Sequence, residues 1–148
     1  MTTWLSPHFS LEELTASETA ARLGLNNAPP AKVREALEAT AAKLEAVRAL
    51  LGKPILINSG YRAPKVNVAV GGSATSHHCK GYAVDFICPG FGRPLEVCRA
   101  IAASGIRYDQ LIHEFGRWTH LSFAPSMRGQ ELTIDSRGTR AGLFEARR

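Results

Sequence analysis

The chain has 148 residues, of which 45% are hydrophobic and 21% charged, which excludes a disordered or fibrous protein and predicts one self-sufficient core. Eighteen lysines and arginines against 13 aspartates and glutamates give a net charge of +5, which permits polyanionic partners without choosing among them. No apolar run approaches the ~20 residues of a membrane span, and the N-terminus lacks the pattern of a signal peptide. We therefore expect a monomer made in the cytoplasm, with no membrane span.

The first third of the chain is predicted to be helical. Ser10 to Glu13 have the pattern of a capping box, which begins a short helix, and a second short helix is expected from Ser17 to Leu23. Apolar residues then recur at helical spacing from Val33 to Leu51 and predict the longest helix. Its apolar stripe is typical of a helix packed on a core.

The rest of the chain alternates between predicted strands and helices. We expect strands at 55–59, 82–87, 110–115 and 118–124, and helices that begin at Pro64 and Pro94. The last two strands form a hairpin through Gly116 and Arg117. This order favours an α+β fold, in which a single domain contains a small antiparallel sheet flanked by helices.

The end of the chain is basic. Five arginines lie where acidic residues are sparse, and no aromatic residues interleave with them: Arg128, Arg137, Arg140, Arg147 and Arg148. This pattern indicates a solvated extension rather than a specific nucleic-acid-binding surface. We therefore assign residues 1–125 to the core domain and residues 126–148 to a basic C-terminal extension, packed on that domain or trailing from it.

The densest chemical signal lies between residues 76 and 85. His78 at the entrance of a predicted strand and Asp85 within that strand could bind one zinc ion together with His120. Two imidazoles and one carboxylate leave the fourth position open, as catalytic zinc sites do. Taken singly, a histidine in such a position is more often a hydrogen-bonded structural residue than a metal ligand. His77 is an alternative to His78 as the zinc ligand. Glu114 ends the strand that pairs with the strand of His120, so its carboxylate is placed to act as a general base.

The sequence SHHCKGYAVD at 76–85, followed by WTH at 118–120, resembles the signature of a superfamily of zinc peptidases. Its members include D-alanyl-D-alanine carboxypeptidases, vancomycin-resistance dipeptidases, bacteriophage L-alanyl-D-glutamate endolysins and the hedgehog signalling domain. The resemblance extends to the segments 9–14, 59–64, 67, 71–72 and 109–112. It therefore covers about residues 8 to 125.

The resemblance implies a hedgehog/D,D-peptidase-like α+β fold with one zinc ion on the sheet face, held by His78, Asp85 and His120. It also implies peptidase action on the stem peptides of peptidoglycan, with Glu114 as the catalytic acid/base. Arg62 is implied to bind or polarise the substrate, and is therefore a second catalytic residue.

One position departs from part of the superfamily. Several relatives carry the catalytic acid three residues before the last histidine, where this chain has Arg117; the hedgehog group uses the longer spacing that Glu114 has here. We expect substrate contacts from Arg62, Ser76, Gln110 and Trp118. Specificity is expected from two loops, Gly71 to Thr75 and Pro89 to Arg93.

These observations predict a zinc metallopeptidase that hydrolyses peptidoglycan stem peptides, as a D,D-carboxypeptidase or an endopeptidase. The missing signal peptide favours a phage or prophage endolysin that reaches the wall after holin-type release, or a virion-associated hydrolase. The positive charge would then attract the anionic cell envelope. The alternatives are a zinc-binding structural module of a phage tail or cell envelope without catalysis, and nucleic-acid binding driven by charge.

Overall fold

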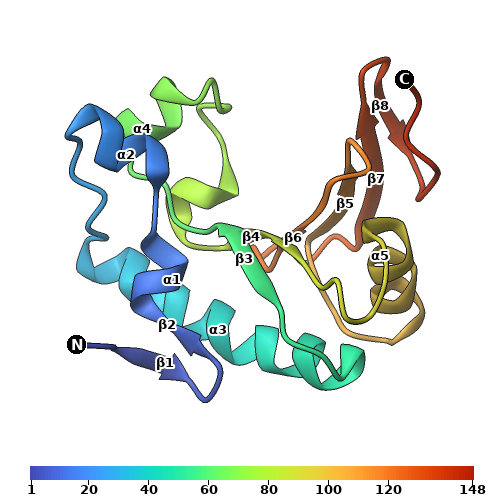
Figure 1. The fold of residues 1–148 in the computed structure, drawn as a ribbon, viewed down its shortest axis with the longest axis horizontal. Helices are drawn as coiled ribbons and strands as arrows, with labels where there is room; N and C mark the ends of the chain where they lie inside the picture. Colours follow the sequence, from blue (N-terminus) through green and yellow to red (C-terminus); the bar gives the residue numbers. More distant parts are fainter.

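A computed structural model describes residues 1–148 as helices packed against one main sheet (Figure 1). In chain order the elements are β1 (Trp4–Ser6), β2 (Phe9–Ser10), α1 (Leu11–Thr15), α2 (Glu18–Leu23), α3 (Ala31–Leu51), β3 (Leu56–Ser59), α4 (Pro64–Ala69), the 3₁₀ helix η1 (His77–Lys80), β4 (Ala83–Ile87), α5 (Pro94–Ala103), β5 (Gln110–Glu114), β6 (Trp118–Ser122), β7 (Gln130–Asp135) and β8 (Gly138–Ala141). None of the helices combines the length and hydropathy needed to cross a bilayer.

The helices predicted from local sequence signals are present. The Ser10 hydroxyl accepts a hydrogen bond from the Glu13 amide at 3.1 Å, and the Glu13 carboxylate accepts one from the Ser10 amide at 2.9 Å. This capping box begins α1, as predicted. The long helix α3 ends at Gly52, whose φ of 66° suits a residue without a Cβ.

The main sheet has six strands in the order β3-β4-β6-β5-β7-β8. Four of its neighbouring pairs are antiparallel, whereas β5 and β7 run parallel. The predicted α+β fold is therefore confirmed. The sheet is mixed because β7 returns beside β5 after the chain has left β6, a long-range pairing that local sequence patterns do not encode.

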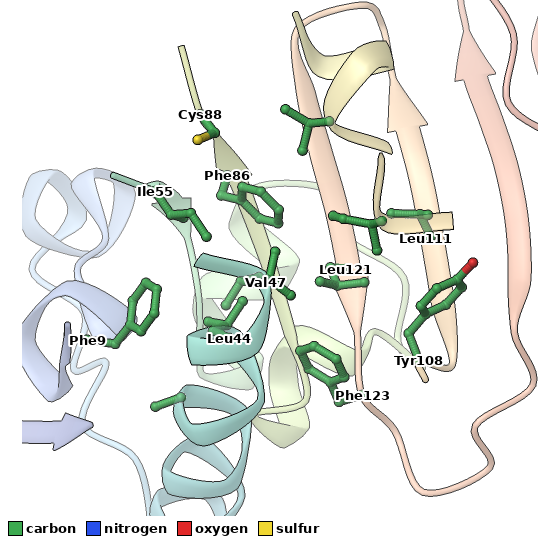
Figure 2. Packing of buried hydrophobic residues seen from close by; sticks show 14 of the residues in the cluster. Phe9, Leu44, Val47, Ile55, Phe86, Cys88, Tyr108, Leu111, Leu121 and Phe123 are labelled. Atoms are coloured by element: carbon green, nitrogen blue, oxygen red, sulfur yellow. The ribbon is translucent and has the colours of Figure 1, made fainter. Parts of the chain in front are cut away.

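The two faces of the sheet differ in polarity. Val84 and Phe86 of β4 are fully buried beneath α3, where they meet Leu44 and Val47 of that helix (Figure 2). Because successive side chains of a strand point to opposite faces, Asp85 lies on the other side of the sheet. The hydrophobic core thus fixes one face of β4 and leaves the other face free for polar chemistry.

Residues 130–141, which the sequence assigns to a solvated extension, form β7 and β8 of the main sheet. The sequence of β7 does alternate, but its apolar residues Leu132 and Ile134 are only partly buried, whereas its buried side chains are the polar Thr133 and Asp135. Asp135 is bound by the guanidinium of Arg147 through contacts of 3.1 and 3.3 Å. Part of the basic charge at this end of the chain therefore offsets a buried carboxylate.

Gly60 lies where the chain leaves β3 and passes the end of α1. A Cβ at this position would lie 2.3 Å from the backbone oxygen of Leu14, which also accepts a hydrogen bond from the Tyr61 amide at 2.7 Å. Only glycine fits this approach of two backbone segments without displacing one of them.

We predict that Gly60→Ala lowers the free energy of unfolding by about 1–3 kcal/mol, because the methyl group forces α1 away from β3. Urea denaturation measures this change. Gly90→Ala is the matched control, because a Cβ there meets only the flexible side chain of Lys53, at 3.2 Å. Equal stability of the two variants would contradict the account of Gly60.

Candidate metal centre and catalytic cavity

Three side chains from separate elements converge on the open face of the sheet. His78, Asp85 and His120 each offer one donor atom, and these atoms lie within 4.8 Å of one another. Asp85 and His120 are opposite each other in the register of β4 and β6, which brings the two side chains together. His78 comes from η1 and not from a strand entrance, because Ser76 caps this short helix by accepting a hydrogen bond from the His78 amide.

The ring of His78 is oriented by the backbone. Its Nδ1 lies 2.8 Å from the carbonyl oxygen of Gly60, which can only accept a hydrogen bond. Nδ1 therefore carries the proton, and Nε2 presents its lone pair to the cluster. A carbonyl that fixes the tautomer in this way is the usual support of a metal-binding histidine. His77 points elsewhere, with its Nδ1 2.7 Å from the hydroxyl of Ser122.

The cluster has the chemistry of a cation site. Nε2 of His78 lies 3.3 Å from Oδ1 of Asp85, so two electron-pair donors face each other at a buried position. Burial raises the pKa of Asp85, but the hydrogen bond with Nδ1 of His120 at 2.9 Å helps to hold this pKa well below its ordinary value. The carboxylate is therefore ionised. Two imidazoles and one carboxylate around one point fit Zn²⁺ and leave a fourth position open.

Glu114 lies at the edge of this cluster. Its Oε1 is 3.8 Å from Nδ1 of His120, and its side chain is 18% exposed. Burial raises the pKa of Glu114 above its ordinary value, and the negative charge of Asp85 raises it further. A carboxylate with a raised pKa at the edge of a candidate metal site is suited to accept and return a proton.

A cavity of about 780 Å³ opens above the cluster. Its wall includes all four residues predicted to contact substrate: Arg62, Ser76, Gln110 and Trp118. The Arg62 guanidinium donates to the Ser76 hydroxyl at 3.3 Å, which ties the two together. Nε of Arg62 is buried and has no hydrogen-bond partner within the protein, which is rare for a buried donor. The indole N–H of Trp118 lies toward the carboxylate of Glu114, its partner in the register of β5 and β6.

The two loops expected to carry specificity differ in position. Gly71, Ser73 and Thr75 line the cavity, in agreement with the expectation for the first loop. No residue from 89 to 93 lines it, so this cavity gives no support to the expectation for the second loop. Arg93 instead binds Glu145 at 3.2 Å and borders a separate, smaller cavity. Sequence alone could not place this loop, because its position depends on how α5 packs against the sheet.

Some lining residues were not predicted. Ile112 lies two residues before Glu114 on β5, so strand alternation could have placed both on one face. Arg128 and Ile134 also line the cavity, but they come from the segment after β6, whose return to the sheet no local pattern predicts. His77 lines the cavity without joining the cluster.

Comparison with known proteins identifies the family. Residues 7–122 match the family model described as peptidase M15, which is well over half of the chain. The matched range contains His78, Asp85, Glu114 and His120, whereas β7 and β8 lie beyond it. A comparison with curated proteins finds no significant match. The chain therefore belongs to the peptidase M15 family.

Proposed function

We propose that this protein is a zinc metallopeptidase that hydrolyses peptide bonds in the stem peptides of peptidoglycan. The observation that carries the proposal is the buried cluster of His78, Asp85 and His120, which lies with Glu114 at the floor of an open cavity in a member of the peptidase M15 family. We propose a D,D-carboxypeptidase or endopeptidase that acts as a monomer, in a phage or prophage endolysin or a virion-associated hydrolase. The net charge of +5 supports attraction to an anionic cell envelope.

The three residues of the cluster would hold one zinc ion. When bound there, zinc supplies a Lewis acid that polarises the scissile carbonyl and acidifies water. The Gly60 carbonyl contributes by keeping Nε2 of His78 free of a proton. Asp85 contributes a carboxylate that stays ionised across the physiological pH range.

Glu114 performs the proton transfers. Its carboxylate accepts the proton of the attacking water and then delivers it to the nitrogen of the leaving amine. Burial of the Glu114 carboxylate, which raises its pKa, suits both steps, because the group must hold the proton briefly and then release it. Arg62 lines the cavity and presents its guanidinium to the oxygen of the substrate that gains negative charge.

The remaining wall residues hold the substrate in place. Trp118 presents a ring surface, and Ser76 and Gln110 offer a hydroxyl and an amide. The loop that contains Ser73 and Thr75 also lines the cavity. These groups orient the peptide without taking part in bond making.

We predict that His78→Ala, Asp85→Ala and His120→Ala each lose stoichiometric zinc, because each removes one of only three donors. Elemental analysis after dialysis against dilute zinc measures this loss, with wild type binding one zinc per chain. His77→Ala is the matched control and should keep its zinc, because its ring contacts Ser122 instead. Full occupancy in His78→Ala with loss in His77→Ala would show that the neighbouring residue is the ligand.

We predict that Glu114→Gln lowers kcat on stem peptides about 10²–10⁴-fold, because the amide cannot accept the proton of water. Zinc content should stay at the wild-type level, since Glu114 is outside the donor set. Mass spectrometry of muropeptides after digestion measures the rate and identifies the bond that is cut. Glu131→Gln is the control, because Glu131 binds the Tyr108 hydroxyl on the other face of the sheet.

Wild-type activity in Glu114→Gln would refute this role for Glu114. A wild-type protein that binds zinc and cleaves none of the stem peptides would instead support the alternative, a structural module that has lost catalysis.

A further inference from the structure

One end of the cavity is formed by a residue outside the family match. Arg128 follows β6 and lines the cavity, and its guanidinium is bound to the carboxylate of Asp109. The contacts are bidentate, with Nε 3.0 Å from Oδ1 and Nη2 2.8 Å from Oδ2. Asp109 is fully buried and also accepts from the Ser126 hydroxyl and the Arg128 amide. The guanidinium is therefore held in one position by a carboxylate that cannot move.

The ion pair uses only one edge of the guanidinium. An arginine has five N–H donors, and the bidentate contact occupies Nε and Nη2, which leaves Nη1 free. The Arg128 side chain is 48% exposed, in contrast to the buried carboxylate behind it. The cavity thus contains a fixed donor that a substrate can reach without the side chain first having to be ordered.

A second side chain lies at the same corner of the cavity. Nδ1 of His77 is 2.7 Å from the Ser122 hydroxyl and 3.8 Å from Oδ2 of Asp109, the carboxylate oxygen that Nη2 of Arg128 contacts. Both side chains line the cavity, and Arg128 supplies the free N–H donors of this corner.

We propose that Arg128 forms a subsite that binds a carboxylate of the substrate, and that it determines specificity for acidic stem peptides. The inference rests on the proposed function and adds to it the charge of the preferred substrate. Asp109 is a positioning residue, because it acts only through the guanidinium that it holds. A carboxylate suits this corner because its oxygens can accept from the N–H groups that Arg128 does not use on Asp109.

The position of the subsite selects the kind of carboxylate. His120 pairs with Ile112 on β5, and Asp109 lies three residues before Ile112. At ~3.3 Å per residue, the backbone of Asp109, which holds Arg128, is about 10 Å along the strand direction from Ile112, or about three residues of an extended peptide. This separation favours an interior carboxylate of the stem peptide over a terminal carboxylate next to the scissile bond.

Two interior groups of a stem peptide carry this chemistry, the α-carboxylate of D-glutamate and the side-chain carboxylate of diaminopimelate. Three synthetic pentapeptides distinguish them: one with both carboxylates free, one with D-glutamate amidated, and one with lysine in place of diaminopimelate. The measured quantity is kcat/KM for each peptide with the zinc-loaded enzyme. We expect wild type to prefer the first peptide by about tenfold over one of the other two, as a charge-assisted hydrogen bond would give.

The variants assign that preference to Arg128. Arg128→Gln should bring the ratio of the two kcat/KM values to about one. Arg128→Lys retains a cation beside Asp109, which protects the fold. It should also lower the ratio, because an ammonium group lacks the planar fork that lets arginine bind Asp109 and the substrate on different sides. Arg147→Gln is the matched control and should keep the wild-type ratio, since Arg147 binds the buried Asp135 in the same way but does not line this cavity.

Three results would overturn the inference. Equal kcat/KM for all three peptides with wild type would remove the subsite while leaving the proposed peptidase intact. A drop of the same factor on every peptide in Arg128→Gln and Arg128→Lys would show that the arginine is only structural. Hydrolysis of none of the peptides by the zinc-loaded wild type would refute the proposed function itself, and the subsite with it.

Discussion

Two electron-pair donors, Nε2 of His78 and Oδ1 of Asp85, face each other across 3.3 Å in a buried site. Such a pair is unfavourable unless a cation lies between or beside the two atoms. The protein nevertheless holds both in place, the imidazole through the Gly60 carbonyl and the carboxylate through its position on a central strand. The arrangement is costly as a structural device but is the expected one for a metal site.

The sheet makes this arrangement possible. The side chains of β4 and β6 that face α3 are apolar and fully buried, as Phe86 and Leu121 are. Their packing fixes the register of the two strands, and a shift by one residue would exchange the core face for the polar face. Asp85 and His120 thus owe their proximity to the hydrophobic residues that alternate with them. Glu114 and Ile112 extend the same polar face onto β5.

The sequence predicted those parts of the fold and site that local patterns encode. The capping box at Ser10 and the apolar stripe of α3 are short-range signals, and both correspond to helices in the structure. Proximity of His78, Asp85 and His120 was also predicted, because the motif spacing and the hairpin before His120 constrain where these residues lie. Their roles as ligands stay a prediction that zinc analysis tests.

The remaining features depend on contacts between distant segments. β7 was not predicted because its buried side chains, Thr133 and Asp135, are polar and its partner β5 lies parallel to it. Arg128 looked like part of a solvated extension because its partner, the buried Asp109, is 19 residues away in the chain. Such ion pairs become visible only when the topology is known, and here they complete the wall of the cavity.

The central claim is that two imidazoles and a carboxylate hold one zinc ion at this site. X-ray absorption spectroscopy of the zinc-loaded protein tests it most directly, because it distinguishes sulfur from nitrogen or oxygen ligands and recognises imidazole rings by their scattering. The account predicts two imidazole ligands, with oxygen completing the shell and no sulfur. A shell that contains sulfur, from Cys79 beside His78, or that contains only one imidazole, would contradict it.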